Sequence, residues 1–250
     1  DTGDFTLSDA YLSVIESIKH ASYAQNKKPV IAWVNSGDFE VSDSVTEKDV
    51  QKKLKTLDGY DGVIVPGGFG SRGIAGKIEV ITYAREHKIP YLGLCYGMQL
   101  AVIEFARNVA GIKGATSKEL DDVAEHQVVT IMESQKDTLR EAKYGGSMRL
   151  GAFQAKLIPG SIVAKAYGST LVSERHRHRY EVNNDYVKLL EEKGLVFSGK
   201  SPDESLMEFI ELPKKVHPFF VGTQAHPEFK SHPLSPHPLF YSFIQAASKK

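Results

Sequence analysis

The segment Tyr91-Leu92-Gly93-Leu94-Cys95-Tyr96-Gly97 leads from a short apolar run into a cysteine with a glycine two positions away on each side. Its first four residues are typical of a buried strand, and residues 98–109 carry apolar side chains at helical spacing. Cys95 is therefore predicted on a tight turn between a strand and a helix, the context of a G-x-nucleophile-x-G elbow. Partial positive charge at a helix N-terminus favours the thiolate form of such a cysteine. The flanking glycines favour catalysis over the alternative, a small buried hydrophobic residue.

Short apolar strands alternate with helices on both sides of this turn. Before residue 110 we expect strands at residues 30–34, 62–65 and 91–94, and helices at residues 9–21, 49–57, 74–86 and 98–109. Such alternation indicates a parallel sheet with helices on both faces, because βαβ crossovers place them there. After a loop at residues 115–125, we expect further strands, some of them antiparallel, at residues 128–132, 151–157, 170–173, 195–198, 206–211 and 219–224. The last helix is expected at residues 239–247. Residues 133–146 read as a second loop. The prediction is one α/β domain over residues 1–250, with an open, mostly parallel sheet and added antiparallel strands.

Composition and charge exclude several classes of protein. The chain has 250 residues, 41% of them hydrophobic, and 31 Lys and Arg balance 31 Asp and Glu. This composition excludes a disordered chain, and zero net charge argues against a general electrostatic grip on nucleic acid. No apolar run approaches the roughly 18 residues that would span a membrane. A single cysteine cannot form an internal disulfide, so we expect a cytoplasmic protein with neither nucleic acid nor membrane as partner.

A thiol nucleophile needs a base and a group that orients the base. Gln224-Ala225-His226-Pro227-Glu228 directly follows an apolar strand, so His226 is predicted at a strand's carboxyl end, as Cys95 is. Open α/β sheets gather their ligand sites along that edge, so the two residues can meet although they are far apart in sequence. We therefore expect His226 as base and Glu228 as its partner. An ordinary exposed loop is the alternative.

A glycine-rich run, Pro66-Gly67-Gly68-Phe69-Gly70, also follows a predicted strand. Its spacing matches neither the Walker A motif nor the dinucleotide-binding fingerprint, which argues against phosphate binding. Bare amides can approach a ligand at such glycines. We expect the amides of Gly68 and Tyr96 to form an oxyanion hole. A plain glycine turn is the alternative.

Basic residues alternate with histidines between residues 175 and 179. Arg175, Arg177 and Arg179 would lie on one face of a strand, with His176 and His178 on the other. Nucleic acid and zinc are possible ligands of such a run, but no Cys or carboxylate set with metal spacing accompanies it. We therefore expect no metal site, one arginine in the substrate pocket, and the others in structural pairs or at a partner surface.

Together, these motifs resemble the triad-type (class I) glutamine amidotransferases, with a glycine-rich strand end, a G-x-C-x-G elbow and a late His-Pro-Glu. The runs at residues 145–151 and 174–184 are more specific and resemble the glutaminase domain of CTP synthase. That resemblance implies a class I amidotransferase fold with Cys95 as nucleophile, His226 as general base and acid, and Glu228 as its orienter. L-glutamine would form a γ-glutamyl thioester, ammonia would leave, and water would release glutamate.

The same resemblance implies the residues that contact glutamine. Its amide end would be held by Gly68, Tyr96, Gly97, Met98 and Gln99, and its head group by Glu119 and Arg179. An ammonium suits a carboxylate, and an α-carboxylate suits a planar guanidinium. Two positions depart from the family: Tyr96 replaces the usual leucine, and Lys118 replaces a Thr or Ser.

The family also implies a longer protein. The chain is expected to be a fragment that lacks an amino-terminal synthase domain and the first strand of the sheet. The synthase domain would bind ATP and Mg and aminate UTP to CTP, with GTP as effector and a homotetramer as the assembly, whereas the present domain needs no cofactor. Alone, it would be at best a slow glutaminase. Two alternatives are another Cys-His-Glu hydrolase of this fold, such as a γ-glutamyl hydrolase or peptidase, and a catalytically silent regulatory module.

Overall fold

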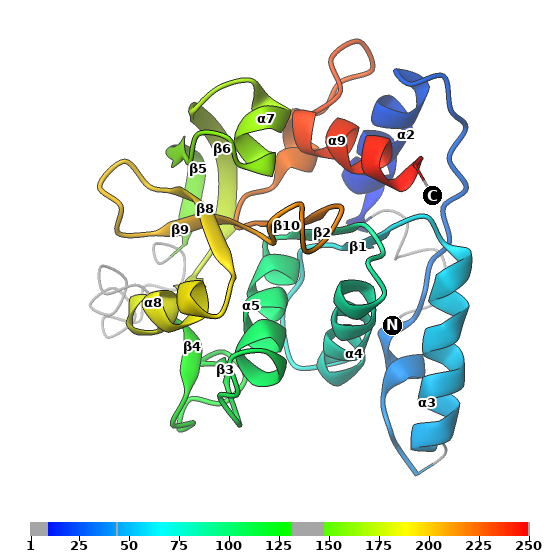
Figure 1. The fold of residues 1–250 in the computed structure, drawn as a ribbon, viewed down its shortest axis with the longest axis vertical. Coiled ribbons are helices and arrows are strands. Elements are labelled where there is room, and N and C mark those ends of the chain that lie inside the picture. The colour runs from blue at the N-terminus through cyan, green and yellow to red at the C-terminus, as the bar shows by residue number, and fades with distance from the viewer. Residues whose placement is uncertain (1–9, 44, 132–147, 250) are drawn as a thin grey trace.

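A computed structural model of the chain describes residues 10–43, 45–131 and 148–249. Its strands form two sheets (Figure 1). The larger sheet has seven strands in the order β1 (Val63–Val65), β2 (Tyr91–Leu94), β10 (Phe220–Thr223), β9 (Met207–Glu211), β8 (Val196–Lys200), β5 (Arg149–Leu157) and β6 (Leu171–His178). The smaller sheet consists of β3 (Thr116–Ser117), β4 (Gln127–Ile131) and β7 (Tyr180–Val182).

Helices cover both faces of the larger sheet (Figure 1). One face packs against α2 (Leu12–Tyr23), α7 (Ile162–Tyr167) and α9 (Pro238–Ala247). The other contacts α3 (Glu47–Leu54), α4 (Ile74–Glu86), α5 (Tyr96–Asn108) and α8 (Asn184–Glu192). Three short 3-10 helices complete the described structure: η1 (Ser36–Phe39), η2 (Lys55–Gly59) and η3 (Pro227–Lys230). Each layer of helices buries its own apolar cluster against the sheet, so the central strands are apolar on both faces.

The parallel part of the sheet is its β1-β2-β10 end. β2 lies between β1 and β10 and runs parallel to both, with Val65 opposite Gly93 and Thr223 opposite Leu94. The three strands therefore end at one edge, and the segments that follow them begin side by side. This edge carries the glycine-rich run, the cysteine turn and the segment with His226.

The predicted α/β fold with helices on both faces and added antiparallel strands is confirmed. Antiparallel pairing is more extensive than expected, since it accounts for four of the six pairings in the larger sheet. The connections between β8, β9 and β10 explain two of these four pairings. They are shorter than the dozen or more residues that a parallel crossover needs.

Several local predictions differ from the structure. Residues 30–34 form no strand, and Val30 and Trp33 are 93% and 50% exposed, because no described strand pairs with this segment. The helices α7 and α8 were not expected, and β6 continues through the basic run to His178. The helix predicted over residues 49–57 ends at Leu54 and continues as η2. The predicted loop at residues 133–146 lies outside the described residues.

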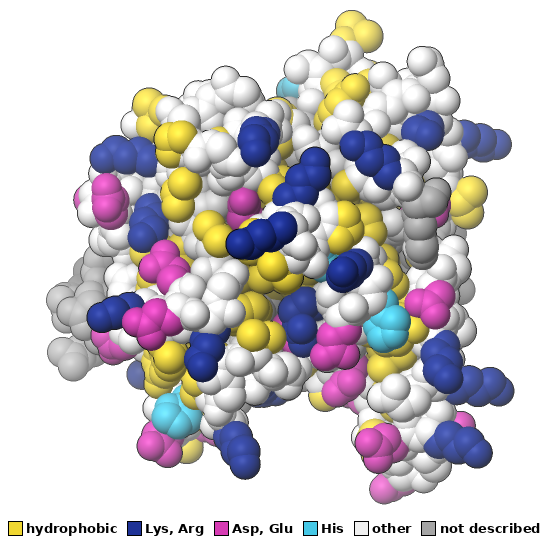
Figure 2. Space-filling view, in the orientation of Figure 1, with side chains coloured by type: hydrophobic (Ala, Val, Ile, Leu, Met, Phe, Trp, Pro, Cys, Tyr) yellow, Lys and Arg dark blue, Asp and Glu magenta, His cyan; other side chains and the backbone are white. Residues whose placement is uncertain are grey.

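The surface shown in Figure 2 carries side chains of both charges, with Asp and Glu lying among Lys and Arg in its lower half. No helix among the described residues has the length and apolar character needed to cross a membrane.

Candidate active site

The turn between β2 and α5 holds Cys95 in a strained backbone conformation. Its φ and ψ are 49° and −98°, values that a residue with a Cβ rarely adopts. The Cys95 amide donates to the Thr223 carbonyl at 2.7 Å, which ties the turn to the end of β10. The predicted elbow is therefore present in the structure, with the cysteine at the N-terminus of α5.

The two glycines of the motif allow close backbone contact. A Cβ at Gly97 would lie 2.1 Å from the Val65 carbonyl oxygen, and one at Gly93 would lie 2.8 Å from the Gly97 carbonyl carbon. Real Cβ atoms do not come this close to backbone atoms, so side chains at either position would push α5 away from β1 and β2. The two glycines thus allow the start of α5, and Cys95 with it, to lie close to the ends of β1 and β2.

His226 and Glu228 lie beside Cys95. The His226 Nδ1 is 2.7 Å from Glu228 Oε1. A Cβ at Gly67 would lie 2.8 Å from His226 Cε1 and 3.6 Å from Cys95 Cβ, so the imidazole and the thiol share one side of the glycine-rich run. The structure therefore brings the nucleophile, base and orienter predicted from the sequence into one place.

The electrostatics of this group favour a charged imidazole. Burial lowers the pKa of His226, but hydrogen bonds and charge interactions with Cys95 and Glu228 outweigh it and raise the pKa to about 10. At neutral pH the ring is then an imidazolium facing the sulfur. A protonated His226 already carries the proton that a general acid must give to a leaving group.

Two further contacts orient the His226 residue. Its amide donates to the Arg175 carbonyl at 2.8 Å, which ties it to β6. The Phe229 ring stacks on the imidazole with centroids 5.2 Å apart and planes at 16°. The ring is thus held by a carboxylate, an aromatic face and the neighbouring strand.

The glycine-rich run lies against the start of α5. A Cβ at Gly68 would be 3.7 Å from Tyr96 Cδ1, so the two predicted oxyanion donors are neighbours. The Tyr96 hydroxyl donates to the Gly70 carbonyl at 2.8 Å, and the Gly70 amide donates to Glu119 Oε1 at 3.2 Å. Burial and the Glu119 charge raise the pKa of Tyr96, so its hydroxyl keeps the proton that it donates. The first amides of a helix have no partner within it and can bind an anion.

A cavity of about 310 Å³ opens beside Cys95. Of the predicted substrate contacts, five line it: Gly68, Tyr96, Gln99, Glu119 and Arg179. The other two do not, because Met98 is fully buried and Gly97 packs against Val65. Five further residues, which were not expected there, line the cavity: Phe69, Met148, Arg177, His178 and Tyr180. Four of these belong to motifs that the sequence had marked as family-specific or basic, but their spacing did not show which side chains turn inward.

Opposite charges meet on the cavity wall. Burial raises the pKa of Glu119, while the Gly70 hydrogen bond and the Arg179 charge act to lower it. The guanidinium is therefore close enough to influence the carboxylate. A carboxylate and a guanidinium in one small cavity suit a zwitterionic amino acid.

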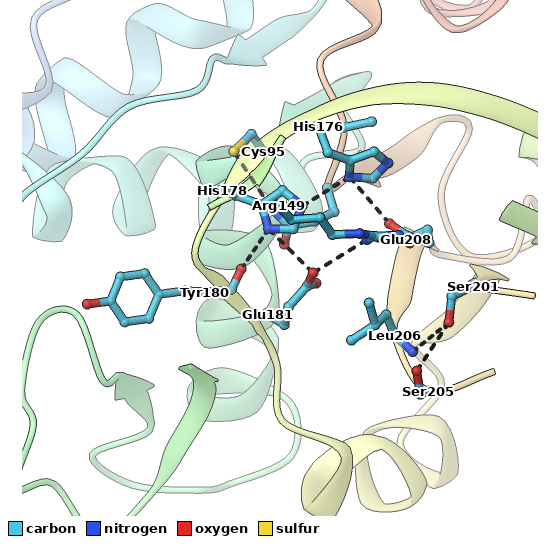
Figure 3. A network of polar contacts seen from close by, with 12 residues as sticks. Cys95, Arg149, His176, His178, Tyr180, Glu181, Ser201, Ser205, Leu206 and Glu208 are labelled. Atoms are coloured by element: carbon cyan, nitrogen blue, oxygen red, sulfur yellow. Dashed lines mark hydrogen bonds and ion pairs between the residues drawn. The ribbon is translucent and has the colours of Figure 1, made fainter. Parts of the chain in front are cut away.

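The two histidines of the basic run, His176 and His178, belong to a buried polar cluster shown in Figure 3, whereas Arg175 and Arg177 are exposed. Two arginines of the run, Arg177 and Arg179, line the cavity, where one was expected. His176 Nδ1 and His178 Nε2 are 3.0 Å apart, and Arg149 lies 2.6 Å from Glu208 and 3.5 Å from Glu181. Burial and neighbouring positive charges, including Arg149, lower the pKa of His176 to about 2 and of His178 to about 3. Both rings are therefore neutral at neutral pH. Within the described ranges, no three His, Cys, Asp or Glu side chains are grouped to hold a metal ion.

The chain is similar to proteins of one family along most of its length. A model of the family "Glutamine amidotransferase class-I" matches residues 6–246. A CTP synthase of Caldanaerobacter subterraneus is 56% identical over 240 residues, which are 96% of this chain and 42% of that protein. A CTP synthase of Saccharopolyspora erythraea is 53% identical over 242 residues, which are 96% of this chain and 41% of that protein. The chain thus spans about two fifths of the length of these relatives.

A solved structure agrees with this similarity. The glutaminase domain of Trypanosoma brucei CTPS, with bound acivicin, superposes with a TM-score of 0.89 at 40% sequence identity. The match covers 99% of this chain and 92% of that one.

Proposed function

Because the chain belongs to the class-I glutamine amidotransferase family, we propose that it hydrolyses the side-chain amide of L-glutamine at Cys95. One observation carries the proposal: the Cys95 turn, the His226–Glu228 pair and a cavity with an acidic and a basic side chain meet at one edge of the sheet. This combination supports a nucleophilic acyl transfer on a small amino acid.

The reaction would proceed in two steps through a thioester. The Cys95 thiolate attacks the side-chain amide carbon, and the negative oxygen that forms is bound by the amides of Gly68 and Tyr96. Each such donor is typically worth about 3 kcal/mol. His226 then donates its proton to the nitrogen, the C–N bond breaks and ammonia leaves. In the second step His226 takes a proton from water, and the resulting hydroxide attacks the thioester carbon. The C–S bond then breaks, which releases glutamate and returns Cys95 to its thiolate form.

The head group of glutamine would lie between Glu119 and Arg179. The carboxylate would bind the α-ammonium group, and the guanidinium would bind the α-carboxylate in a bidentate fashion. Gln99, which also lines the cavity, would contact the amide end. A hydrolase acting on peptides would have no use for this pair of charges.

The role of the ammonia is proposed from the matched proteins, which are named CTP synthases and are more than twice as long as this chain. We propose that the ammonia aminates UTP to CTP in an amino-terminal synthase domain that uses ATP and Mg. GTP activation, a homotetramer and a cytoplasmic location belong to the same proposal.

Covalent labelling with 6-diazo-5-oxo-L-norleucine tests the proposed substrate. This electrophile resembles glutamine, so we expect intact-mass and peptide analysis to find one adduct, on Cys95, whose formation is blocked by excess glutamine. The Cys95→Ala variant serves as the control and should remain unlabelled. No adduct on the wild type would favour a silent regulatory module. An adduct that glutamine does not block would favour another hydrolase of this fold.

Tyr96→Phe tests whether the tyrosine hydroxyl keeps the glycine-rich run at residues 66–70 in place beside Cys95. The variant loses only the hydrogen bond to the Gly70 carbonyl, so we expect kcat for glutamine hydrolysis to fall about 5- to 10-fold, a typical effect of one lost buried hydrogen bond. Tyr83→Phe is the matched control, since the Tyr83 hydroxyl bonds to Asp58 at 3.0 Å, away from the cavity. Equal rates for the two variants would contradict a role of Tyr96 in catalysis.

A further inference from the structure

Strand register places a second side chain beside the cysteine sulfur. Thr223 lies opposite Leu94 in the parallel pairing of β10 and β2, and the Cys95 amide continues this ladder by donating to the Thr223 carbonyl. The next residue of each strand, Gln224 and Cys95, therefore leave the sheet side by side. On its other flank, the Gln224 amide donates to the Glu208 carbonyl at 2.9 Å. The Gln224 backbone is thus held from two neighbouring strands.

The Gln224 side chain is completely buried and points to the sulfur. Its Nε2 lies 3.7 Å from Cys95 Sγ, within hydrogen-bond range for sulfur. Its Oε1 accepts a hydrogen bond from Gln99 Nε2 at 3.1 Å. Gln99 Nε2 also donates to the Tyr180 carbonyl at 2.9 Å, so its own orientation is determined by a backbone oxygen.

These contacts determine which end of the Gln224 amide faces the sulfur. If its oxygen and nitrogen were exchanged, two N–H groups would face each other at Gln99, and the oxygen would face Cys95. The observed arrangement instead turns an N–H donor to the sulfur. Figure 3 shows Cys95 beside the network that continues through Tyr180 to the buried cluster.

A hydrogen bond from such a donor to a neutral thiol is weak, because the thiol sulfur is a poor acceptor. A thiolate is a charged acceptor, and hydrogen bonds to charged groups are about twice as strong. The buried N–H therefore suits a sulfur that reacts as a thiolate.

We propose that Gln224 is a further catalytic residue, whose side-chain amide donates a hydrogen bond to the Cys95 thiolate and orients it toward the substrate. The inference rests on the proposed function, since it needs Cys95 to be the nucleophile. During thioester formation the hydrogen bond weakens as the charge leaves the sulfur, and it forms again when glutamate departs. Gln99 acts as a positioning residue that keeps the Gln224 amide in this orientation.

Gln224→Met removes the donor but keeps nearly the same length and volume. We expect kcat for glutamine hydrolysis to fall about 10- to 100-fold with less than about a threefold change in KM, since a charge-assisted hydrogen bond is lost at the reacting atom. Alkylation by iodoacetamide reports the thiolate without glutamine. We expect its rising limb with pH to move up by about one unit in Gln224→Met.

Thr223→Val is the matched control, because the Thr223 hydroxyl is also fully buried and accepts from the Ala225 amide, on the opposite face of the strand from Gln224. It should leave the alkylation profile unchanged while reducing stability. An unshifted profile and unchanged kcat in a folded Gln224→Met variant would overturn the inference.

Gln224→Glu is a second variant in case the methionine variant does not fold. Its protonated acid can donate to the sulfur, whereas its carboxylate repels the thiolate, so its activity relative to wild type should decline as pH rises from about 6 to 8. A constant ratio would count against the inference. If the proposed function itself is wrong, the result differs: the wild-type protein would neither hydrolyse glutamine nor react with 6-diazo-5-oxo-L-norleucine.

Discussion

Replacing Cys95 with alanine is expected to lower the rate of glutamine hydrolysis by roughly four orders of magnitude or more, because the thioester can no longer form. The substitution keeps a Cβ, so it leaves the strained backbone at φ 49° unchanged and should preserve the fold. Glutamate release at saturating glutamine gives the rate, and urea denaturation gives the free energy of unfolding.

Cys95→Gly is the informative companion to this variant. Glycine adopts positive φ without strain, so we expect it to be equally inactive but more stable than the alanine variant by about 1 kcal/mol. If either variant retained more than about one hundredth of the wild-type rate, another nucleophile would have to be sought.

The Glu228→Gln substitution is expected to lower kcat by about 10³- to 10⁴-fold, as in other triads whose carboxylate becomes an amide. The glutamine amide can donate to His226 Nδ1, which forces the ring proton to the nitrogen that must face Cys95 as a base. Without the carboxylate at 2.7 Å, the pKa of His226 should also fall from about 10. We therefore expect the alkaline limb of kcat to move to lower pH.

The free energy of unfolding should also depend on the protonation of His226. The raised pKa of His226 means that its protonated form is stabilised by folding, so this contribution is complete below about pH 6.5 and is lost as pH rises toward 10. The difference in unfolding free energy between wild type and Glu228→Gln should therefore be largest near pH 6 and smallest near pH 10.

Glu174→Gln is the matched control, since Glu174 accepts from His237 Nε2 at 3.0 Å in another buried histidine–carboxylate pair. It should reduce stability but leave most of the hydrolysis intact. If it slowed the reaction as much as Glu228→Gln, the effect of Glu228 would be structural.

Local sequence was enough to predict the elements whose signals lie within a few residues. The Cys95 elbow needs only its two glycines and an apolar run before and after it, and the helix over Ile74–Glu86 agrees with the predicted residues 74–86. His226 and Glu228 are two residues apart, so their pairing is also local. The meeting of His226 with Cys95 could be predicted because parallel strands end at one edge.

Longer-range interactions decided the features that were missed. An apolar, β-branched run such as residues 30–34 favours a strand, but a strand also needs a neighbour to complete its hydrogen bonds, and no described strand provides one. The alternation of residues 175–179 predicted two faces of a strand. It could not show that His176 and His178 would lie against Arg149, Glu181 and Glu208.

What the sequence determined by itself is therefore the chemistry: a cysteine on a strained turn, a histidine with a carboxylate, and glycines where bare amides are needed. Tertiary structure alone decided which further side chains, beyond those predicted, share that site. Gln224 reaches the sulfur because β10 pairs with β2 in one particular register, although the two residues are 129 positions apart. A shift by one residue would turn its side chain to the opposite face, and the hydrophobic pattern of one strand cannot specify its register against another.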